Sequence, residues 1–565
     1  MRKTLSGLLV LVLALSFIFV FTGCGDDGNQ ESEGFVSPLT ITITTIGDAT
    51  TEAVAKVQTE LNKITEGKFN THVILNVVKE SEYEERLNEM ITANDEGLVN
   101  IGGSDVIIGA TTETAVVTKV NELTGRVETV YPTADKNQLD IFLIPEGWAK
   151  YNEYAENVLL SDLSTFLTDS NGKLLNQYIP SAVLNSCMID GALYGVPSNV
   201  PYGDCEFLFI NKELYDNYNY SMDEVDEIYD IQNFLVDVAK DVKSGKLTDV
   251  VPLYNISDMT LLSLTGRKSV VAQAVSNTAS VTDGSFIPLN ILTIPAVQNM
   301  AKLVNEINSA CGIMPVTDES ADLSANFAAG FVRGGLGLVE EYSDEYYIIN
   351  TRVAVADAED LYRGIYGVST YAEAYADRCM QLITCLNTNA EFRNILAYGV
   401  KNEHYIVSED TGIVSRASDD YIMDIYRTGN VFLLMQNDQM TAEELSLSAN
   451  GWKNAIEANG KAIVSPYAQC VIDFSESKAN STANYKVLSE VVPELERLYD
   501  EIWVWISEYP EAVNSEGEQP AFATYIQDLQ KKLNADVYVK SATSTTQETS
   551  LRKQYGTWYE LNYPS

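Results

Sequence analysis

The chain has 565 residues, 45% of them hydrophobic, and its 80 acidic against 37 basic side chains give a formal net charge of −43 at pH 7. This length exceeds what one hydrophobic core usually supports, so we expect at least two domains. A surface this acidic repels nucleic acid and anionic lipid headgroups, which excludes a nucleic-acid partner.

The first 38 residues are typical of an export signal followed by a tether. An apolar run at 8–21 leads into Phe21-Thr22-Gly23-Cys24, which resembles a bacterial lipobox. The alternative is a transmembrane anchor, but a span needs about 20 apolar residues. We therefore predict a signal peptide at 1–23. We also predict a mature N-terminus at Cys24 that carries fatty acyl chains such as palmitate, and a flexible tether at 24–38 rich in Asp, Glu, Gly and Ser. The acylated protein would then be anchored to the extracytoplasmic face of the cell membrane.

The remaining cysteines and the histidines predict neither a metal site nor a cofactor. Six cysteines have scattered spacings, which favours buried free thiols, although disulfides stay possible outside the cell. There is no Cys-x-x-Cys pair, and His72 and His404 are the only histidines, so zinc is not expected. The six cysteines are Cys187, Cys205, Cys311, Cys379, Cys385 and Cys470.

After the tether, strand and helix patterns alternate. Strands are expected at 39–46, 73–78, 105–109 and 140–144, with helices whose apolar stripes cover 54–64 and 83–91 between the first three. This βαβ order predicts a mainly parallel sheet. Ligands gather at the carboxyl ends of such strands, which makes three residues candidates for ligand binding: Asp48, Thr111 and Trp148.

The segment from Asp190 to Lys212 predicts a turn, a link and a core strand. Gly191 and Gly195 permit unusual backbone angles, Pro197 disfavours a helix, and the apolar run at 207–210 predicts a strand buried on both faces.

Further along, the pattern continues to alternate. We expect helices at 212–218, 225–242 and 371–386, and a strand at 250–254.

Two motifs resemble a known family. Asp190-Gly-Ala-Leu-Tyr-Gly-Val-Pro197 resembles the segment with which family 1 extracellular solute-binding proteins, the substrate-capturing subunits of ABC importers, pass from one lobe to the other. Residues 394–405 are similar to the "LxxYGxEGxHY" segment of a lipoprotein branch of that family, with Lys401-Asn402 in place of the usual Glu-Gly.

The resemblance implies an α/β fold of the two-lobed, type II periplasmic-binding-protein kind with three hinge crossings. These crossings would lie near 196–202, 362–367 and 427–431. Residues 326–339 resemble the family's segment in which a helix end and a glycine turn, here at Gly334 and Gly335, precede a strand, after which the chain would return at 362–369. The first lobe would comprise 39–198 plus 364–428, and the second lobe 199–363 plus 429–565. The implied partners are a small solute and the permease subunits of an ABC transporter.

Aromatic residues are the main indication of the ligand. The chain has 32 Tyr and 5 Trp, and flat rings with a polar edge suit the alternating apolar and hydroxyl surfaces of sugars. Most such rings are nevertheless core residues in any protein. By their positions near strand ends and crossings, the remaining ligand candidates are Tyr202, Arg333, Tyr342 and Tyr366.

The function expected from these features is capture of a sugar or oligosaccharide. The motifs of a P-loop and of a nucleophile elbow are absent from the sequence, so we do not expect an enzyme. Two alternatives stay open: a receptor for peptides or another non-sugar solute, and a surface-anchored glycoside hydrolase that uses two of the many carboxylates.

Overall fold

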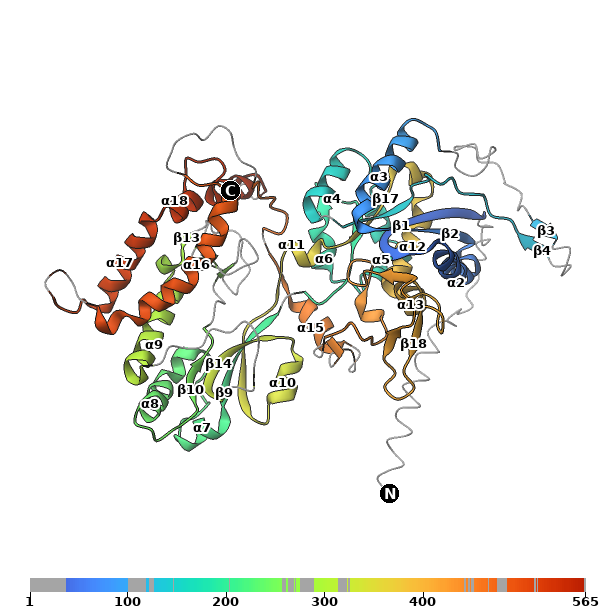
Figure 1. The fold of residues 1–565 in the computed structure, drawn as a ribbon. Helices are drawn as coiled ribbons and strands as arrows, with labels where there is room; N and C mark the ends of the chain where they lie inside the picture. Colours follow the sequence, from blue (N-terminus) through green and yellow to red (C-terminus); the bar gives the residue numbers. More distant parts are fainter. Residues whose placement is uncertain are drawn as a thin grey trace, which may run out of the picture. The chain divides into compact units, whose positions relative to one another are not determined.

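The computed structural model contains two main β-sheets, each packed among its own helices (Figure 1). The signal peptide, most of the tether, Cys24, Thr111 and the strand expected at 105–109 lie outside the residues that the structure describes. The described residues are 37–99, 118–120, 127–145, 147–202, 204–256, 261–262, 269, 271–274, 289–312, 323, 326–441, 444–445, 448, 452–465, 467–474, 485–512, 515 and 517–562.

The first sheet has the strand order β2-β1-β5-β17-β8, and β20 pairs with the end of β1. β1 lies parallel to β2 and β5, but β17, β8 and β20 pair antiparallel with their neighbours. The prediction of a mainly parallel sheet is therefore wrong, because three strands come from later segments outside the initial βαβ progression. The strands are β1 (Leu39–Ala49), β2 (Thr71–Val78), β5 (Ile141–Ile144), β8 (Gly195–Pro197), β17 (Ile365–Val368) and β20 (Tyr421–Met423).

Of the helices packed around this sheet, α2, α3 and α12 form where apolar stripes predicted helices, whereas the other four were not predicted (Figure 1). α2 begins where the side chain of Thr50 accepts the N–H of Ala53, and it ends at Asn70 in the left-handed conformation. Its buried Val57 and Leu61 pack into a core shared by the whole sheet. The helices are α2 (Thr51–Phe69), α3 (Glu80–Asp95), α4 (Gly147–Glu156), α5 (Ser170–Leu175), α6 (Ser181–Ser186), α12 (Ala376–Thr388) and α13 (Ala390–Tyr398).

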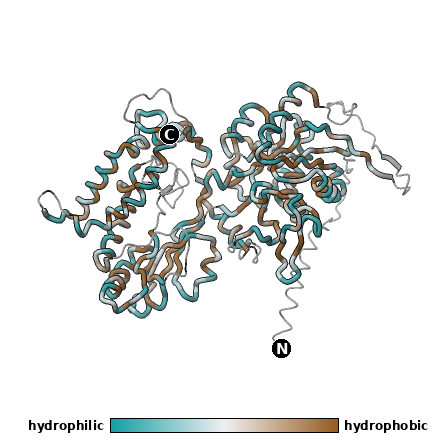
Figure 2. Tube along the Cα trace, in the orientation of Figure 1, coloured by the Kyte–Doolittle hydropathy of each residue, from teal (hydrophilic) through white to brown (hydrophobic). Residues whose placement is uncertain are grey.

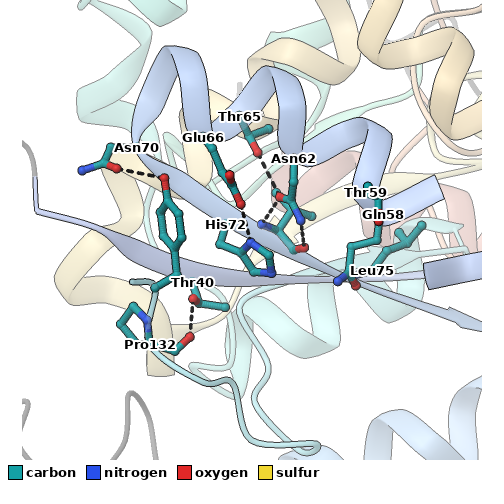
Figure 3. Close-up of polar contacts among 12 residues, drawn as sticks. Thr40, Gln58, Thr59, Asn62, Thr65, Glu66, Asn70, His72, Leu75 and Pro132 are labelled. Atoms are coloured by element: carbon teal, nitrogen blue, oxygen red, sulfur yellow. Dashed lines mark hydrogen bonds and ion pairs between the residues drawn. The ribbon is translucent and has the colours of Figure 1, made fainter. Parts of the chain in front are cut away.

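Side chains from α2 occupy the outer edge of β2, the last strand of this sheet (Figure 3). Asn62 accepts the N–H of Val73 at 2.6 Å and donates to the carbonyl of Val73 at 2.9 Å. Gln58 accepts the N–H of Leu75 at 3.0 Å. These amides take the place of a further strand in satisfying backbone groups of β2.

The second sheet has the order β10-β14-β9-β15, with β10 parallel to β14 and β9 antiparallel to both of its neighbours. The expectation for 326–339 is wrong in its order: β14 comes first, and the short helix α10 follows the glycine turn. The apolar run of β14 is buried along nearly its whole length, which favours a central strand. The elements are β9 (Cys205–Asn211), β10 (Val251–Tyr254), β14 (Phe327–Gly334), β15 (Tyr346–Arg352) and α10 (Gly337–Tyr342).

Both faces of the second sheet are covered, as predicted for the run at 207–210. Leu208 and Ile210 belong to a large helical core, whereas Phe207 and Phe209 belong to a smaller cluster on the opposite face. Hydrophobic residues follow the strands of both sheets, and hydrophilic residues follow the outer turns (Figure 2). The helices are α7 (Lys212–Asn217), α8 (Gln232–Lys243), α9 (Pro295–Cys311), α16 (Leu488–Ser507), α17 (Phe522–Ala535), α18 (Val537–Thr543) and α19 (Leu551–Asn562).

Two segments beyond the expected lobe boundaries pack with the first sheet. Val431, Trp452 and Ala468 are buried in its core, although 429–565 was assigned to the second lobe. Leu361 and Tyr362 lie there too.

The remaining elements are short. Both main sheets belong to the larger of two compact units, and the smaller unit contains Thr112–Val130 with the antiparallel pair β3 and β4. The short elements are β3 (Thr118–Val120), β4 (Val127–Thr129), β6 (Met188–Ile189), β7 (Ala192–Leu193), β11 (Leu261–Leu262), β12 (Val271–Ala274), β13 (Leu289–Asn290), β16 (Val355–Ala356), α11 (Ala358–Leu361), β18 (Tyr405–Val407), β19 (Val414–Arg416), α15 (Lys453–Lys461) and β21 (Ile463–Val464).

The six cysteines after Cys24 are all free thiols, which agrees with the preferred prediction. Burial raises the pKa of Cys385 to about 11 and that of Cys187 to about 12. Within the described ranges, no helix has both the length and the apolar character needed to span a bilayer.

Candidate functional site

Three segments that were expected to link two lobes lie against one another. The N–H of Ser198 donates to the carbonyl of Gly364 at 2.8 Å, and the N–H of Val431 donates to the carbonyl of Asn199 at 2.9 Å. Gly364 lies so close to Arg427 that an added β-carbon would come within 2.3 Å of the Arg427 carbonyl oxygen. We call these segments the junction: 196–202, 362–367 and 427–431.

A buried asparagine ties α15 to the junction. Asn459 donates through Nδ2 to the carbonyl of Val200 at 2.7 Å and accepts the N–H of Tyr202 at 3.0 Å. The hydroxyl of Tyr202 lies 3.3 Å from the carbonyl of Ser198, and burial raises the pKa of this tyrosine. Tyr202 is fully buried, so its ring offers no open face to a ligand in this conformation.

Tyr366, on β17, is also a core residue. Its hydroxyl is hydrogen-bonded to Oγ1 of Thr45 at 2.8 Å, and burial raises its pKa to about 12. Tyr202 and Tyr366 thus stabilise the packing around the junction, which is the common role of a buried tyrosine.

Trp148 has the geometry of a stacking platform. It lies at the start of α4, directly after β5, and its half-buried ring is 5.0 Å from the ring of Tyr362 and 5.7 Å from that of Tyr151. Both supporting tyrosines are fully buried, and their hydroxyls donate to the carbonyls of Ser186 and Cys187. Because its support is fixed, the exposed part of the indole ring is pre-organised for contact.

Asp48 and Tyr342 lie on separate elements of the two sheets. The exposed carboxylate of Asp48, near the end of β1, lies 3.3 Å from Nζ of Lys79. Tyr342 ends α10, and its half-buried ring lies 6.1 Å from that of Phe209. Asp48 therefore fits a solvated ion pair, and Tyr342 covers the edge of the smaller core cluster of the second sheet.

Arg333 belongs to a row of charges that the sequence did not indicate as a whole. Glu206 on β9 is in register with Arg333 on β14 and with Arg352 on β15, so the three side chains share one face of the sheet. We call these residues the Arg–Glu–Arg row. A signal for it was present in the sequence, since Glu206 is a carboxylate beside a fully apolar run.

Asp360, beside the junction, is a carboxyl group with an unusual pKa. Its Oδ2 accepts the N–H of Asp357 at 3.3 Å, and its Oδ1 accepts from Nη2 of Arg363 at 3.4 Å. Burial and the neighbouring charge of Asp357 raise the pKa of Asp360 to about 6, against the opposing effect of Arg363.

Asp360→Asn should therefore change the pH dependence of stability. The unfolded pKa is about 3.9, so the folded state binds the extra proton between about pH 4 and 6, and the free energy of unfolding falls as the pH rises through that window. We expect the free energy of unfolding of the variant to exceed that of the wild type by up to about 3 kcal/mol at pH 7 and to differ little from it below pH 4. Urea unfolding at several pH values measures this; an equal gain at every pH would contradict it.

Comparisons with known proteins identify similar structures but no similar sequences. No protein-family model and no curated protein matches this chain. Among solved structures, the N-glycan transport solute binding protein of Streptococcus pneumoniae is 15% identical, with 93% of this chain and 99% of that chain covered and a TM-score of 0.41.

Two further structures match at similar levels. An HMO-binding, ABC-transporter-associated solute binding protein of Bifidobacterium longum infantis is 14% identical, with 89% of this chain and 98% of that chain covered and a TM-score of 0.39. An extracellular solute-binding protein family 1 structure from Alicyclobacillus acidocaldarius is 13% identical, with 88% of this chain and 98% of that chain covered and a TM-score of 0.40. Each of the three alignments covers most of this chain and nearly all of the matched chain.

Proposed function

We propose that this protein is the solute-binding subunit of an ABC importer, which captures a sugar or oligosaccharide and delivers it to a membrane permease. The observation that carries the proposal is the placement of the segment 190–212, which begins with the motif that resembles family 1 solute-binding proteins. Gly195–Pro197 forms β8 of the first sheet, and Cys205–Asn211 forms β9 of the second, so residues 198–204 carry the chain from one sheet to the other. A link of this kind, bonded to two other segments, suits a hinge.

The proposal includes two lobes and a lipid anchor. The first lobe would be built around the β1 sheet and the second around the β9 sheet, with a ligand held between them. Acylation of Cys24 would keep the protein on the extracytoplasmic face of the cell membrane, near its permease. This part is supported by the lipobox and the tether composition at the N-terminus.

Trp148 is the residue best placed to contact a sugar from the first lobe. Its ring follows the carboxyl end of β5, it is partly open, and buried aromatic residues support it. Sugar rings stack well on such surfaces because their apolar C–H faces match an indole ring.

Ligand binding by wild-type protein and by Trp148→Ala tests the proposal. A thermal-shift screen of oligosaccharides, peptides and other solutes should identify a ligand, because a ligand at 100 times its Kd stabilises by about 2.7 kcal/mol. Loss of the stacking ring should weaken binding by about 1–3 kcal/mol, measured by calorimetric titration. The matched control is Trp558→Ala, which removes a half-buried indole from α19 and should bind normally.

The outcomes separate the proposal from its rivals. Stabilisation by peptides alone would identify a peptide receptor, and hydrolysis of a bound oligosaccharide would identify a glycoside hydrolase. Wild-type affinity in Trp148→Ala would remove this residue from the site.

A further inference from the structure

The Arg–Glu–Arg row lies at the end of the second sheet where ligands are expected. Arg333 is the second-last residue of β14, Arg352 is the last residue of β15, and β14 runs parallel to β10. Carboxyl ends of parallel strands are the usual ligand side of an α/β sheet.

The central carboxylate of the row is buried and lies within ion-pair distance of Arg333. Glu206 is 1% exposed, and its Oε2 lies 3.7 Å from Nε of Arg333, beyond an ordinary hydrogen bond. Thr351 occupies a β-bulge beside the row and donates to the Glu206 carbonyl at 3.0 Å. Arg333 remains partly exposed, with 39% of its side chain accessible.

Arg352 has an N–H group without a hydrogen-bond acceptor in the described part of the chain. Its buried Nε has no hydrogen-bond partner among the described residues. A buried guanidinium N–H without an acceptor is costly, so an acceptor from outside this part of the chain would stabilise it.

Asp204, directly before β9, adds a second carboxylate to the two arginines and Glu206 of the Arg–Glu–Arg row. Desolvation raises the pKa of its carboxyl group, and the guanidinium groups of Arg333 and Arg352 oppose that rise. Asp204 directly precedes Cys205, which is in register with Gly334, the neighbour of Arg333. The formal charges of the four described side chains, Asp204, Glu206, Arg333 and Arg352, therefore sum to zero.

We propose that Asp204, Arg333 and Arg352 form a subsite for the hydroxyl groups of an uncharged saccharide, with Glu206, which is in register with both arginines, as the positioning residue. This inference rests on the proposed solute-binding function and narrows its ligand class. A saccharide hydroxyl can accept from a guanidinium N–H while an adjacent hydroxyl donates to Asp204. A ligand carboxylate or phosphate would instead meet arginines that are already neutralised, with a carboxylate beside them.

The experiment compares neutral and acidic saccharides on the full-length protein. The probes are neutral gluco-, xylo- and manno-oligosaccharides of two to six units and the corresponding uronic-acid oligosaccharides, each titrated at low and high salt. We expect the wild type to prefer a neutral probe, with an affinity that changes little with salt because the ligand carries no charge.

Charge-changing variants give the sharper test. Arg352→Gln and Arg333→Gln should each lower the affinity for the neutral probe about 10- to 100-fold, which corresponds to the loss of one charged hydrogen bond. Asp204→Asn should weaken it too and should also raise affinity for the acidic probe relative to the neutral one, since one positive charge is then uncompensated. The control Arg416→Gln removes a guanidinium of 38% exposure on β19 and should bind as the wild type does. Melting temperature checks folding in every variant.

The results distinguish this inference from the proposed function. If Trp148→Ala loses binding while Arg352→Gln and Asp204→Asn keep wild-type affinity and selectivity, the subsite is refuted and the solute-binding function stands. A wild-type preference for acidic saccharides with salt-sensitive affinity would overturn the uncharged ligand class. If neither saccharide set raises the melting temperature, the sugar-binding function and the subsite are both refuted.

Discussion

Replacing Asp140 by alanine is expected to lower the free energy of unfolding by about 3–5 kcal/mol. Oδ2 of this fully buried carboxylate accepts from the N–H of Thr42 at 2.7 Å and from Nε2 of Gln138 at 2.7 Å. Oδ1 accepts from the hydroxyl of Tyr375 at 2.7 Å. Alanine would leave these donors buried without an acceptor, in the middle of the first sheet.

Asp140→Asn is the matched control for this result. Burial raises the pKa of Asp140, although the donors around it oppose the rise. An asparagine oxygen can keep the bonds to Thr42 and Gln138, and its amide can donate to Tyr375, so we expect a change within about 1.5 kcal/mol of zero. Urea unfolding followed by circular dichroism measures all three proteins. Equal losses for alanine and asparagine would show that the negative charge itself, and not the acceptor, is required.

Replacing Gly364 by alanine is expected to destabilise the protein by about 2–4 kcal/mol. The new β-carbon would lie 2.3 Å from the carbonyl oxygen of Arg427 and 2.9 Å from its α-carbon, and both belong to backbone that cannot move aside alone. Relief requires two segments of the junction to separate, which would strain the hydrogen bond from Ser198 to Gly364.

Gly67→Ala provides the control because this glycine lies within α2 and its added β-carbon would meet nothing within 4 Å. There alanine should be neutral or should stabilise by about 0.5–1 kcal/mol, as in other helix interiors. Differential scanning calorimetry of both variants makes the comparison. A Gly364→Ala protein as stable as Gly67→Ala would mean that the junction segments separate at no cost.

Local sequence patterns predicted where helices and strands lie better than they predicted whether paired strands run parallel or antiparallel. The strands at 39–46, 73–78 and 250–254 are confirmed because β-branched and apolar residues fill them and turns bound them. The stretch 326–339 was assigned in the wrong order because short runs of alanine and glycine do not distinguish a buried strand from a helix. Antiparallel pairing of β17 and β20 depends on segments more than 200 residues further along, which no local pattern records.

The candidate site was predictable only in part for the same reason. Trp148 could be proposed from the sequence because it follows a strand end, and strand ends can be predicted from the sequence. Tyr202 and Tyr366 were proposed from their places near crossings, but their positions do not say whether a ring turns outward or into the core. Arg352 was missed because it meets Glu206 through the register of strands about 145 residues apart.

The side chains that occupy the edge of β2 also affect how separate copies of the protein behave toward each other. An uncovered strand edge is a template on which another chain can add a strand, and this is a common route to aggregation. At β2, an incoming strand would have to displace Asn62 and Gln58 from Val73 and Leu75. A displaced amide that stays buried without a partner costs about 1–3 kcal/mol. This cost opposes strand addition at β2, even where copies are crowded together on one surface.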